Sequence, residues 1–168
     1  MRSMALILLL ISGWCMASGS EKKIYGYVEK VWLKDVDHVV SAKLDTGAKS
    51  ASLSAIDIRE VEEDNKIWLV FKVPTKHGVV QLKREYVGTV KIKTRIEEKK
   101  TGKNVHIHRP VVFMKMRIGD KEQEIRVNLT NRKSFNYPLL LGRDAIIQFD
   151  GVVDPSLKFT VKLIKEEK

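Results

Sequence analysis

Short apolar runs separated by turn residues recur from Ile24 to the end of the chain, and they restrict the fold more than any other feature. Clear examples are IYGYVEKVWL at 24–33, KIWLVFKV at 66–73 and HIHRPVVFMKMRI at 106–118. β-Branched and aromatic residues alternate with polar ones in these runs, which is the period-two pattern of half-buried strands. Several strands at this spacing predict an all-β sandwich or barrel.

The segments between the runs predict turns and one helix. Residues 34–37 have the composition of a hairpin turn, and the charged stretch EEKKTGKN at 97–104 predicts an exposed hairpin tip. A short helix is predicted after Gly142, within RDAIIQF at 143–149. The sequence therefore predicts a strand-rich domain with one short helix near its C-terminal end.

The N-terminal segment differs from the rest of the chain. Arg2 precedes an apolar run over residues 4–17, and small residues follow it. This is the pattern of a secretory signal peptide, and the run is shorter than the roughly 20 residues that span a membrane. We expect a signal peptide at 1–19 and one domain at 20–168, exported to the periplasm without stable membrane insertion. The alternative is a membrane anchor formed by an uncleaved signal.

Cysteine and charge narrow the function further. Cys15 is the only cysteine and lies in the predicted signal, so the mature domain is expected to lack disulfides and thiol chemistry. The formal net charge of +10 favours anionic partners such as acidic peptides or cell-wall polymers. Export argues against nucleic acid as the natural partner. A basic surface that only contacts solvent is the alternative reading of the same charge.

An Asp-Thr-Gly triplet, Asp45-Thr46-Gly47, follows the apolar run VVSAKL at 39–44. Two carboxylates about 3 Å apart share one proton, so one acts as a base and the other as an acid toward an amide bond. A glycine after Thr lets the backbone turn tightly and brings its amides near the carboxylate. By itself the triplet is also compatible with an ordinary polar turn, because it is short enough to occur by chance.

A second block, YPLLLGRDAI at 137–146, favours the interpretation of the triplet as an active-site motif over an ordinary turn. It resembles the distal half of a retropepsin-type domain, in which an apolar strand ending in Gly-Arg-(Asn/Asp) leads into a short helix. The blocks KLDTGAKSASLSA, HRPVV, VNLTNR, PLLLGRDAI and VDPS occur in the order found in a bacterial family labelled ATP-dependent zinc protease or retropepsin-like aspartic peptidase. They cover about residues 24–160. The resemblance implies a closed, retropepsin-like β-barrel with one short helix.

The residues do not support the ATP and zinc of that family label. The chain contains neither His-Glu-x-x-His nor the glycine spacing of a phosphate-binding loop. His106 and His108 share one face of a predicted strand, but no third ligand is indicated for a metal. We therefore expect no metal and no cofactor.

The resemblance implies an aspartic endopeptidase that acts as a homodimer, because each chain offers a single Asp45. The two carboxylates would activate water directly, and no covalent intermediate is needed. Thr46 would brace the loop across the dimer, Gly47 would permit the turn, and Ala48 would complete the active-site loop. A peptide or protein is the implied substrate.

Residues behind the loop are implied to support it, namely Gly142, Arg143 and Asp144. Arg143 is expected to be a structural ion-pair member. The retroviral pattern has an acidic residue where this chain has Lys49, so Arg143 must find another partner or the ion pair is absent. Lys49 and Ser50 are candidates for substrate contacts, and a cation there would favour acidic side chains. The alternative for Lys49 is a solvated loop lysine.

The flap over the active site is predicted in residues 66–83, where two apolar strands flank Pro74 and Gly78. Trp68 and Phe71 in this segment are expected to belong to the core rather than to contact substrate.

Two other functions are compatible with the same residues. The first is a catalytically silent β-barrel that binds peptides or cell-wall anions through its basic face, since a fold does not determine a function. The second is a nucleic-acid-binding module, which would need an aromatic and basic stacking pattern that this sequence lacks. The intact Asp45-Thr46-Gly47 favours the peptidase over both.

Overall fold

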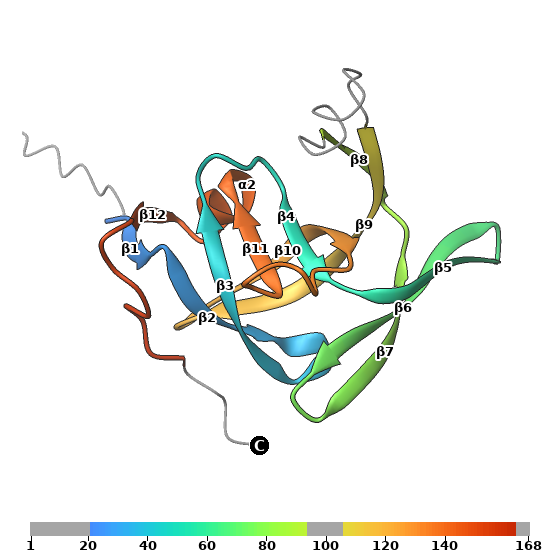
Figure 1. Ribbon diagram of the computed structural model, residues 1–168, viewed down its shortest axis with the longest axis horizontal. Helices are drawn as coiled ribbons and strands as arrows, with labels where there is room; N and C mark the ends of the chain where they lie inside the picture. Colours follow the sequence, from blue (N-terminus) through green and yellow to red (C-terminus); the bar gives the residue numbers. More distant parts are fainter. Residues whose placement is uncertain (1–20, 94–105, 164–168) are drawn as a thin grey trace, which may run out of the picture.

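The computed structural model describes residues 21–93 and 106–163 (Figure 1). The predicted signal peptide at 1–19 and the predicted hairpin tip at 97–104 lie outside the described residues. Within them the chain is mainly strand, with one 3-10 turn and one short α-helix. The elements in chain order are β1 (Lys23–Gly26), β2 (Val28–Leu33), η1 (Lys34–Val36), β3 (His38–Asp45), β4 (Ala51–Ser54), β5 (Ile56–Glu63), β6 (Lys66–Thr75), β7 (Gly78–Glu85), β8 (Gly88–Lys93), β9 (His106–Ile118), β10 (Lys121–Thr130), β11 (Leu139–Gly142), α2 (Arg143–Gln148) and β12 (Gly151–Asp154).

The central sheet closes on itself. Its strand order is β10-β4-β11-β3-β2-β9, with β8 added beyond β9, and the pairing of β9 with β10 closes the ring. The interior is filled by fully buried side chains such as Val31, Leu53, Met114, Val127 and Leu141. Burial of these aliphatic side chains is the main force that holds the barrel together. The predicted all-β, closed barrel with one short helix near the C-terminus is confirmed.

The register of β11 against β3 brings two distant parts of the sequence together. The strands run parallel, with Leu139 opposite Ala42 and Gly142 opposite Asp45. Parallel strands end at the same edge of a sheet, so the end of β3 and the start of α2 meet there. In Figure 1 both lie at the upper edge of the barrel.

The turn between β2 and β3 has the position predicted for it. η1 follows β2 directly, and Asp37 adopts a left-handed conformation with a φ of 44° before β3 begins. Asp and Asn tolerate this conformation better than most residues. Its carboxylate also accepts a hydrogen bond from the indole N–H of Trp32 at 3.0 Å, which ties the turn to β2.

A separate three-stranded sheet, ordered β5-β6-β7, packs beside the barrel. Leu69, Phe71 and Val73 of β6 are buried in the common core. Phe71 is therefore a core residue, as predicted. Trp68 is half-buried, with the ammonium of Lys83 at 5.1 Å from its ring, so the prediction of a core position is only partly met.

The C-terminal segment is fastened across the short parallel pair of β1 and β12. The buried Glu29 carboxylate accepts hydrogen bonds from the N–H of Gly26 at 2.7 Å and from the N–H and hydroxyl of Thr160 at 3.0 and 2.6 Å. These bonds hold residues 155–163 against the start of the barrel. Over residues 21–93 and 106–163, no helix has the length and apolar character needed to cross a membrane.

Candidate active site

Asp45 is the last residue of β3, and a tight turn follows it. Its Oδ1 accepts hydrogen bonds from the N–H of Gly47 at 3.0 Å and of Ala48 at 3.2 Å. Its Oδ2 accepts a hydrogen bond from Lys43 Nζ at 3.1 Å. The side chain keeps 27% of its accessible surface. The predicted arrangement of loop amides around the carboxylate is present, and the carboxylate remains open to solvent on one side.

Several groups act on the pKa of this carboxyl. Burial raises the pKa of Asp45, but the hydrogen bond and the charge of Lys43 lower it, and so do the N–H groups of Gly47 and Ala48. The pKa lies below its ordinary value as a result. A single chain thus presents Asp45 as a carboxylate at neutral pH, and this is the form in which an aspartate can act as a base.

Lys43 is a site residue that the sequence analysis did not single out. It stands two positions before Asp45 on β3, so both side chains project from the same face of the strand. The period-two spacing of an acid and a base in KLD was the available signal. This signal is weak, because lysines on strands are usually solvated.

Glycine is favoured at position 47 because a side chain would be crowded there, and not because the backbone needs a positive φ. It is absent from the described residues with positive φ, so its conformation is open to other residues. A Cβ at this position would lie 3.2 Å from Asp45 Oδ1. Glycine therefore leaves room beside the carboxylate, while the turn itself is closed by a hydrogen bond from Ala48 N to Asp45 O at 3.2 Å.

The junction of β11 and α2 supports the loop from behind. The N–H of Arg143 donates to Ala48 O at 2.8 Å, and the N–H of Asp144 donates to Lys49 O at 3.1 Å. A Cβ on Gly142 would lie only 2.6 Å from Lys49 O. The predicted supporting role of Gly142 thus has a physical basis, because only glycine allows the two backbones to approach this closely.

We expect Gly142→Ala to destabilise the protein by about 1–3 kcal/mol, the usual cost of overpacking a close contact. The backbone at Gly142 is extended, with φ −83° and ψ −179°, so alanine suffers no conformational penalty there. The loss must then come from displacement of the loop at Lys49. Urea unfolding measures this loss of stability. An unchanged unfolding midpoint would show that the loop moves aside without destabilising the protein.

Of the two alternatives left open for Arg143, another ion-pair partner or no ion pair, the described residues show the second. Its exposed guanidinium donates instead to the carbonyl oxygens of Thr46 at 3.3 Å and Gly47 at 3.5 Å. No ion pair of Arg143 is found within residues 21–93 and 106–163. The reason is the one foreseen from the sequence: Lys49 occupies the position where an acidic partner would stand. Arg143 therefore stabilises the loop through its backbone carbonyls.

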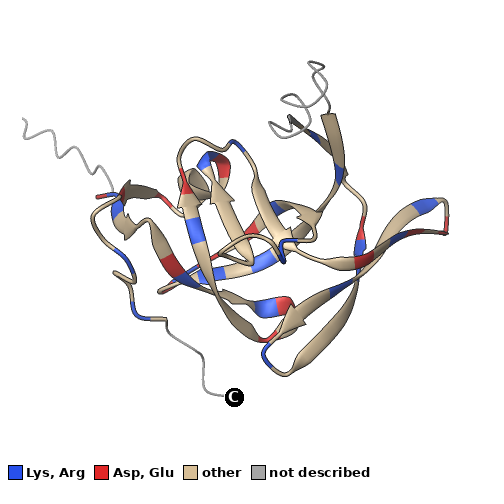
Figure 2. Cartoon of the chain, viewed as in Figure 1, with Lys and Arg blue, Asp and Glu red and all other residues tan. Residues whose placement is uncertain are grey.

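A pocket of about 710 Å³ opens beside the loop, and its lining is strongly basic. Lys49 and Ser50 both line it, which places the two predicted substrate-contact candidates on one surface. Figure 2 shows Lys and Arg colouring on the β3–β4 loop, on β8 and on β9 around this region. The charged and aromatic residues of the lining are Lys49, Lys91, Arg109, Arg126, Arg132, Phe135 and Asp144, of which only Asp144 is acidic.

Two arginines of this pocket, Arg132 and Arg109, have no acidic partner among the described residues; Arg132 is buried and Arg109 is half-buried. Arg132 is 6% exposed; its Nε donates to Tyr137 O at 3.0 Å, and its guanidinium lies 4.3 Å from the ring of Phe135. Within residues 21–93 and 106–163, the guanidinium of Arg109 has one long contact of 3.5 Å, to Asn128, and its buried Nε has no hydrogen-bond partner. Burial lowers the pKa of both arginines, and for Arg132 the charge of Arg109 lowers it further. Two neighbouring cations that are partly removed from water and lack a counter-ion among the described residues favour binding of an anion.

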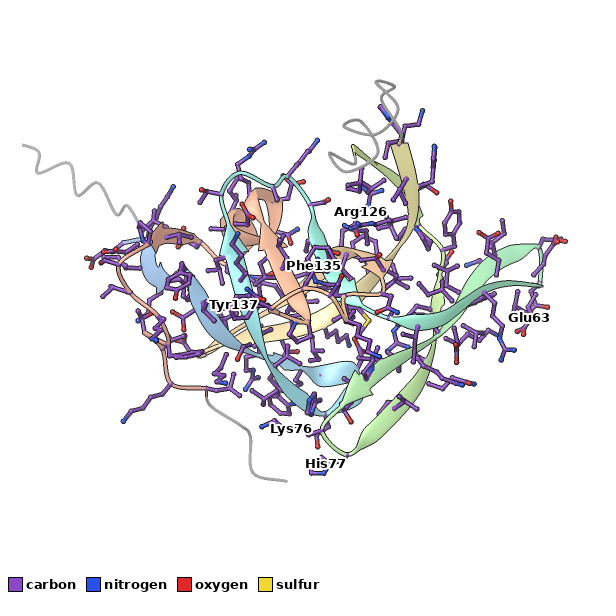
Figure 3. The ribbon with its side chains drawn as sticks, viewed as in Figure 1. Glu63, Lys76, His77, Arg126, Phe135 and Tyr137 are labelled. Atoms are coloured by element: carbon purple, nitrogen blue, oxygen red, sulfur yellow. The ribbon has the colours of Figure 1, made fainter. Side chains whose placement is uncertain are left out.

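The predicted flap in residues 66–83 is wrong. The turn between β6 and β7 lies beside His38–Ser41 at the start of β3, and a strand of this length separates that end from Asp45 by roughly 20 Å. Figure 3 shows Lys76 and His77 of this turn at the lower end of the molecule, whereas Arg126 and Phe135 lie toward the upper end. The strands that flank the basic pocket beside the Asp45 loop are β8 and β9, through Thr89–Ile92 and Arg109. Sequence periodicity could not distinguish the two hairpins, because both alternate in the same way.

The histidines considered for zinc lie on β9. His106 and His108 are exposed and stand opposite Lys93 and Lys91 of β8. Within the part of the chain that the structure describes, no three His, Cys, Asp or Glu side chains gather as metal ligands.

Comparison with known proteins agrees with this geometry. Residues 24–163 match the model of a family described as RimB-like, retropepsin-like aspartic endopeptidase RimB. The crystal structure of a protein of unknown function from Legionella pneumophila is 55% identical to the chain, with a TM-score of 0.70 over 83% of this chain and 98% of that one.

Curated relatives are larger proteins. One from Desulfotalea psychrophila, named "Probable alpha-L-glutamate ligase", is 26% identical over 90% of this chain and 32% of its own length. A relative of the same name from Shewanella halifaxensis is 29% identical over 71% of this chain and 25% of its own length. The chain thus spans between a quarter and a third of the length of these relatives. The match over residues 24–163, together with the barrel and the Asp45 loop, shows that the chain belongs to the RimB-like family of retropepsin-like aspartic endopeptidases.

Proposed function

We propose that the protein is an exported aspartic endopeptidase that hydrolyses acidic peptides as a homodimer. The observation that carries the proposal is the Asp45 carboxylate, held by two loop amides at the end of β3 and still open on one side. One carboxylate can act as a base, but amide hydrolysis also needs an acid for the leaving nitrogen. A second copy of the chain supplies that group as its own Asp45.

The proposed reaction needs no group beyond the two Asp45 side chains and water. One proton is shared between the two carboxyls, because like charges about 3 Å apart do not both persist. The ionised carboxylate takes a proton from water as the water oxygen attacks the peptide carbonyl. The protonated carboxyl then donates to the nitrogen as the C–N bond breaks. Thr46 is proposed to brace the loop across the dimer axis.

The basic pocket beside the loop supports an acidic substrate. Arg132 is buried, Arg109 is half-buried with a buried Nε, and neither has an acidic partner in the described chain. Lys49 and Arg126 add to their charge. A substrate carboxylate would restore the hydrogen bonds that these guanidinium groups lack. The names of the curated relatives point in the same direction, since they describe proteins that handle glutamate.

The proposed contact between copies lies beside the active-site loop. Ile147 is 72% exposed and stands one helical turn after Arg143, whose side chain contacts the loop. Ile24 and Val152 are neighbours in the register of β1 and β12 and are 54% and 42% exposed. Exposed apolar side chains on α2 and on the β1–β12 pair are a suitable surface for a second copy.

We expect Ile147→Asp to weaken dimerisation by roughly tenfold or more, because it introduces a charge into an apolar contact. The specific activity should fall in parallel and recover at higher protein concentration. Sedimentation velocity measures the dimerisation, and an activity assay over the same series of protein concentrations measures the specific activity. Ile67→Asp is the matched control, since Ile67 is 43% exposed on β6, away from the loop. Equal dimerisation of the two variants would place the contact elsewhere.

The test of the function is a cleavage assay on the purified protein. It is incubated from about pH 4 to pH 8, the range over which a shared-proton pair changes state, with a diverse peptide mixture that includes Glu-rich members. Mass spectrometry identifies the products. Cleavage beside acidic residues by the parent chain supports the proposal. Cell fractionation of an expressing bacterium tests export, with the protein expected in the periplasmic fraction.

A catalytically silent binding domain is the second candidate, because the basic pocket would serve it equally well. It predicts salt-sensitive binding of acidic peptides without any cleaved product. The cleavage assay therefore separates the two functions directly.

A further inference from the structure

The contact between Lys43 and Asp45 concerns the oxygen that the loop leaves free. Oδ1 of Asp45 is occupied by the amides of Gly47 and Ala48, and Oδ2 is bound by Lys43 Nζ at 3.1 Å. Both groups are partly accessible, with 46% of the Lys43 side chain and 27% of the Asp45 side chain exposed. A surface ion pair is usually of little consequence for stability. Here, however, the acid is the group on which the proposed reaction depends.

The other charged groups near Asp45 do not replace this contact. Arg143 of α2 bonds to the carbonyl groups of the loop, and Asp144 binds the loop through its backbone N–H. Lys49 faces the basic pocket. On the neighbouring strands, Val28 of β2 and Leu140 of β11 stand opposite Lys43 and carry no charge. Lys43 is the cation that touches the Asp45 carboxylate among the described residues.

We propose that Lys43 is a positioning residue of the active site, whose ammonium group holds Asp45 Oδ2 and sets the pH range over which the Asp45 pair keeps its single shared proton. The proposal rests on the proposed function, because the pair forms only in the dimer. A positive charge beside each carboxylate favours loss of the shared proton to solvent. Both titrations of the pair therefore shift to lower pH, and they are properties of the pair rather than of one residue.

The direction of the effect follows from these charges. Lys43 contributes to a pKa of Asp45 below the ordinary value, so its removal raises the pKa. The singly protonated pair then persists to higher pH, and the whole bell-shaped profile of kcat/KM moves upward in pH. We expect Lys43→Met to raise the ratio of rates at about pH 7 and pH 5 by a factor of roughly 2 to 5, the equilibrium effect of a partly exposed ion pair.

Two further variants isolate the charge of Lys43. Lys43→Arg keeps the charge and should keep the parent profile. Lys30→Met is the matched control, because Lys30 Nζ also binds a β3 residue, Ser41 Oγ at 2.9 Å, without touching Asp45. This variant should have the parent profile as well. A role of Lys43 in folding alone would change the rate at every pH by the same factor and leave the profile in place.

A second readout separates this proposal from the proposed function. Carbon-13 NMR of labelled aspartate carboxyls follows the titration of Asp45 directly, with Asp45→Asn used to assign the signal. If the parent cleaves peptides and the Lys43→Met profile coincides with it, the role of Lys43 is wrong and the peptidase stands. If no variant cleaves peptides, the peptidase proposal fails. A higher titration midpoint of Asp45 in Lys43→Met than in the parent would still support the effect of Lys43 on Asp45. An unchanged midpoint overturns the proposal in either case.

Discussion

Replacement of Asp45 by Asn is expected to abolish peptide hydrolysis, with a loss of more than roughly 1,000-fold in kcat/KM, since general acid–base catalysis by one group is worth up to about 10,000-fold. Asparagine has nearly the same shape, and its carbonyl oxygen can still accept from Gly47 and Ala48. It cannot take a proton from water or hold the shared proton. The chemistry is thus lost while most of the loop contacts remain.

The matched control for this variant is Asp57→Asn. Asp57 also accepts a hydrogen bond from a lysine, Lys72 at 2.8 Å, and it lies on β5, away from the loop. Its left-handed φ of 53° is tolerated by asparagine. Full activity in Asp57→Asn and none in Asp45→Asn, with equal unfolding midpoints, would assign the chemistry to Asp45. Residual cleavage in Asp45→Asn would identify a contaminating peptidase or another mechanism.

Mixing the same variant with the parent chain tests the shared site. If each dimer needs two intact Asp45 side chains, an equal mixture that exchanges subunits leaves about a quarter of the dimers active, whereas independent sites would leave about half. The measurement is the rate against the fraction of Asp45→Asn at constant total protein. A straight line would contradict the dimeric site even if the peptidase activity itself is real.

Replacement of Arg109 by Gln is the second large effect that we expect. The guanidinium of Arg109 lies in the basic pocket with a buried Nε that has no hydrogen-bond partner. Loss of a charge-assisted hydrogen bond to a substrate carboxylate should lower kcat/KM for a Glu-rich peptide by roughly 10- to 100-fold. For the matching Gln-rich peptide, kcat/KM should change little. The preference for acidic peptides therefore falls, while hydrolysis as such persists.

Arg59→Gln is the control for charge alone. Arg59 is exposed on β5, and its removal changes the net charge equally. An equal loss in both variants would mean that the whole basic surface attracts the substrate over long range, a salt-dependent effect on association. A loss in Arg109→Gln alone, insensitive to salt, would locate recognition in the pocket. Arg132 is less suitable for this test because its bond to Tyr137 O also supports the fold.

Much of the architecture could be predicted from the pattern of residues. The alternating runs predicted strands, and the closed barrel with its helix at Arg143–Gln148 confirms the expected class. The turn at Lys34–Val36 was equally clear, because its composition interrupts two apolar runs. The Asp45 loop was predicted because Asp45-Thr46-Gly47 occurs together with four further blocks in the order found in the resembled family.

The errors have physical causes of their own. The flap was assigned to the wrong hairpin because β6–β7 and β8–β9 show the same alternation, and only strand order decides which one reaches the Asp45 loop. For Arg143 the sequence left open whether an ion pair forms; its guanidinium donates instead to the carbonyl groups of Thr46 and Gly47. Hydrogen bonds to backbone carbonyl groups cannot be predicted from the sequence, because every residue has such a group.

The strand pattern and the Asp45-Thr46-Gly47 motif could be read from the sequence alone, because they depend on local periodicity and on short motifs. The support of this loop by the block around Gly142 was implied by the family resemblance, because the two blocks lie far apart in the chain. The contact of Lys43 with Asp45, and the position of Arg109 and Arg132 in one pocket, appear only in the folded chain. Such contacts depend on register and burial, because barrel closure brings β9 and the segment after β10 to the same place and removes water from their charges.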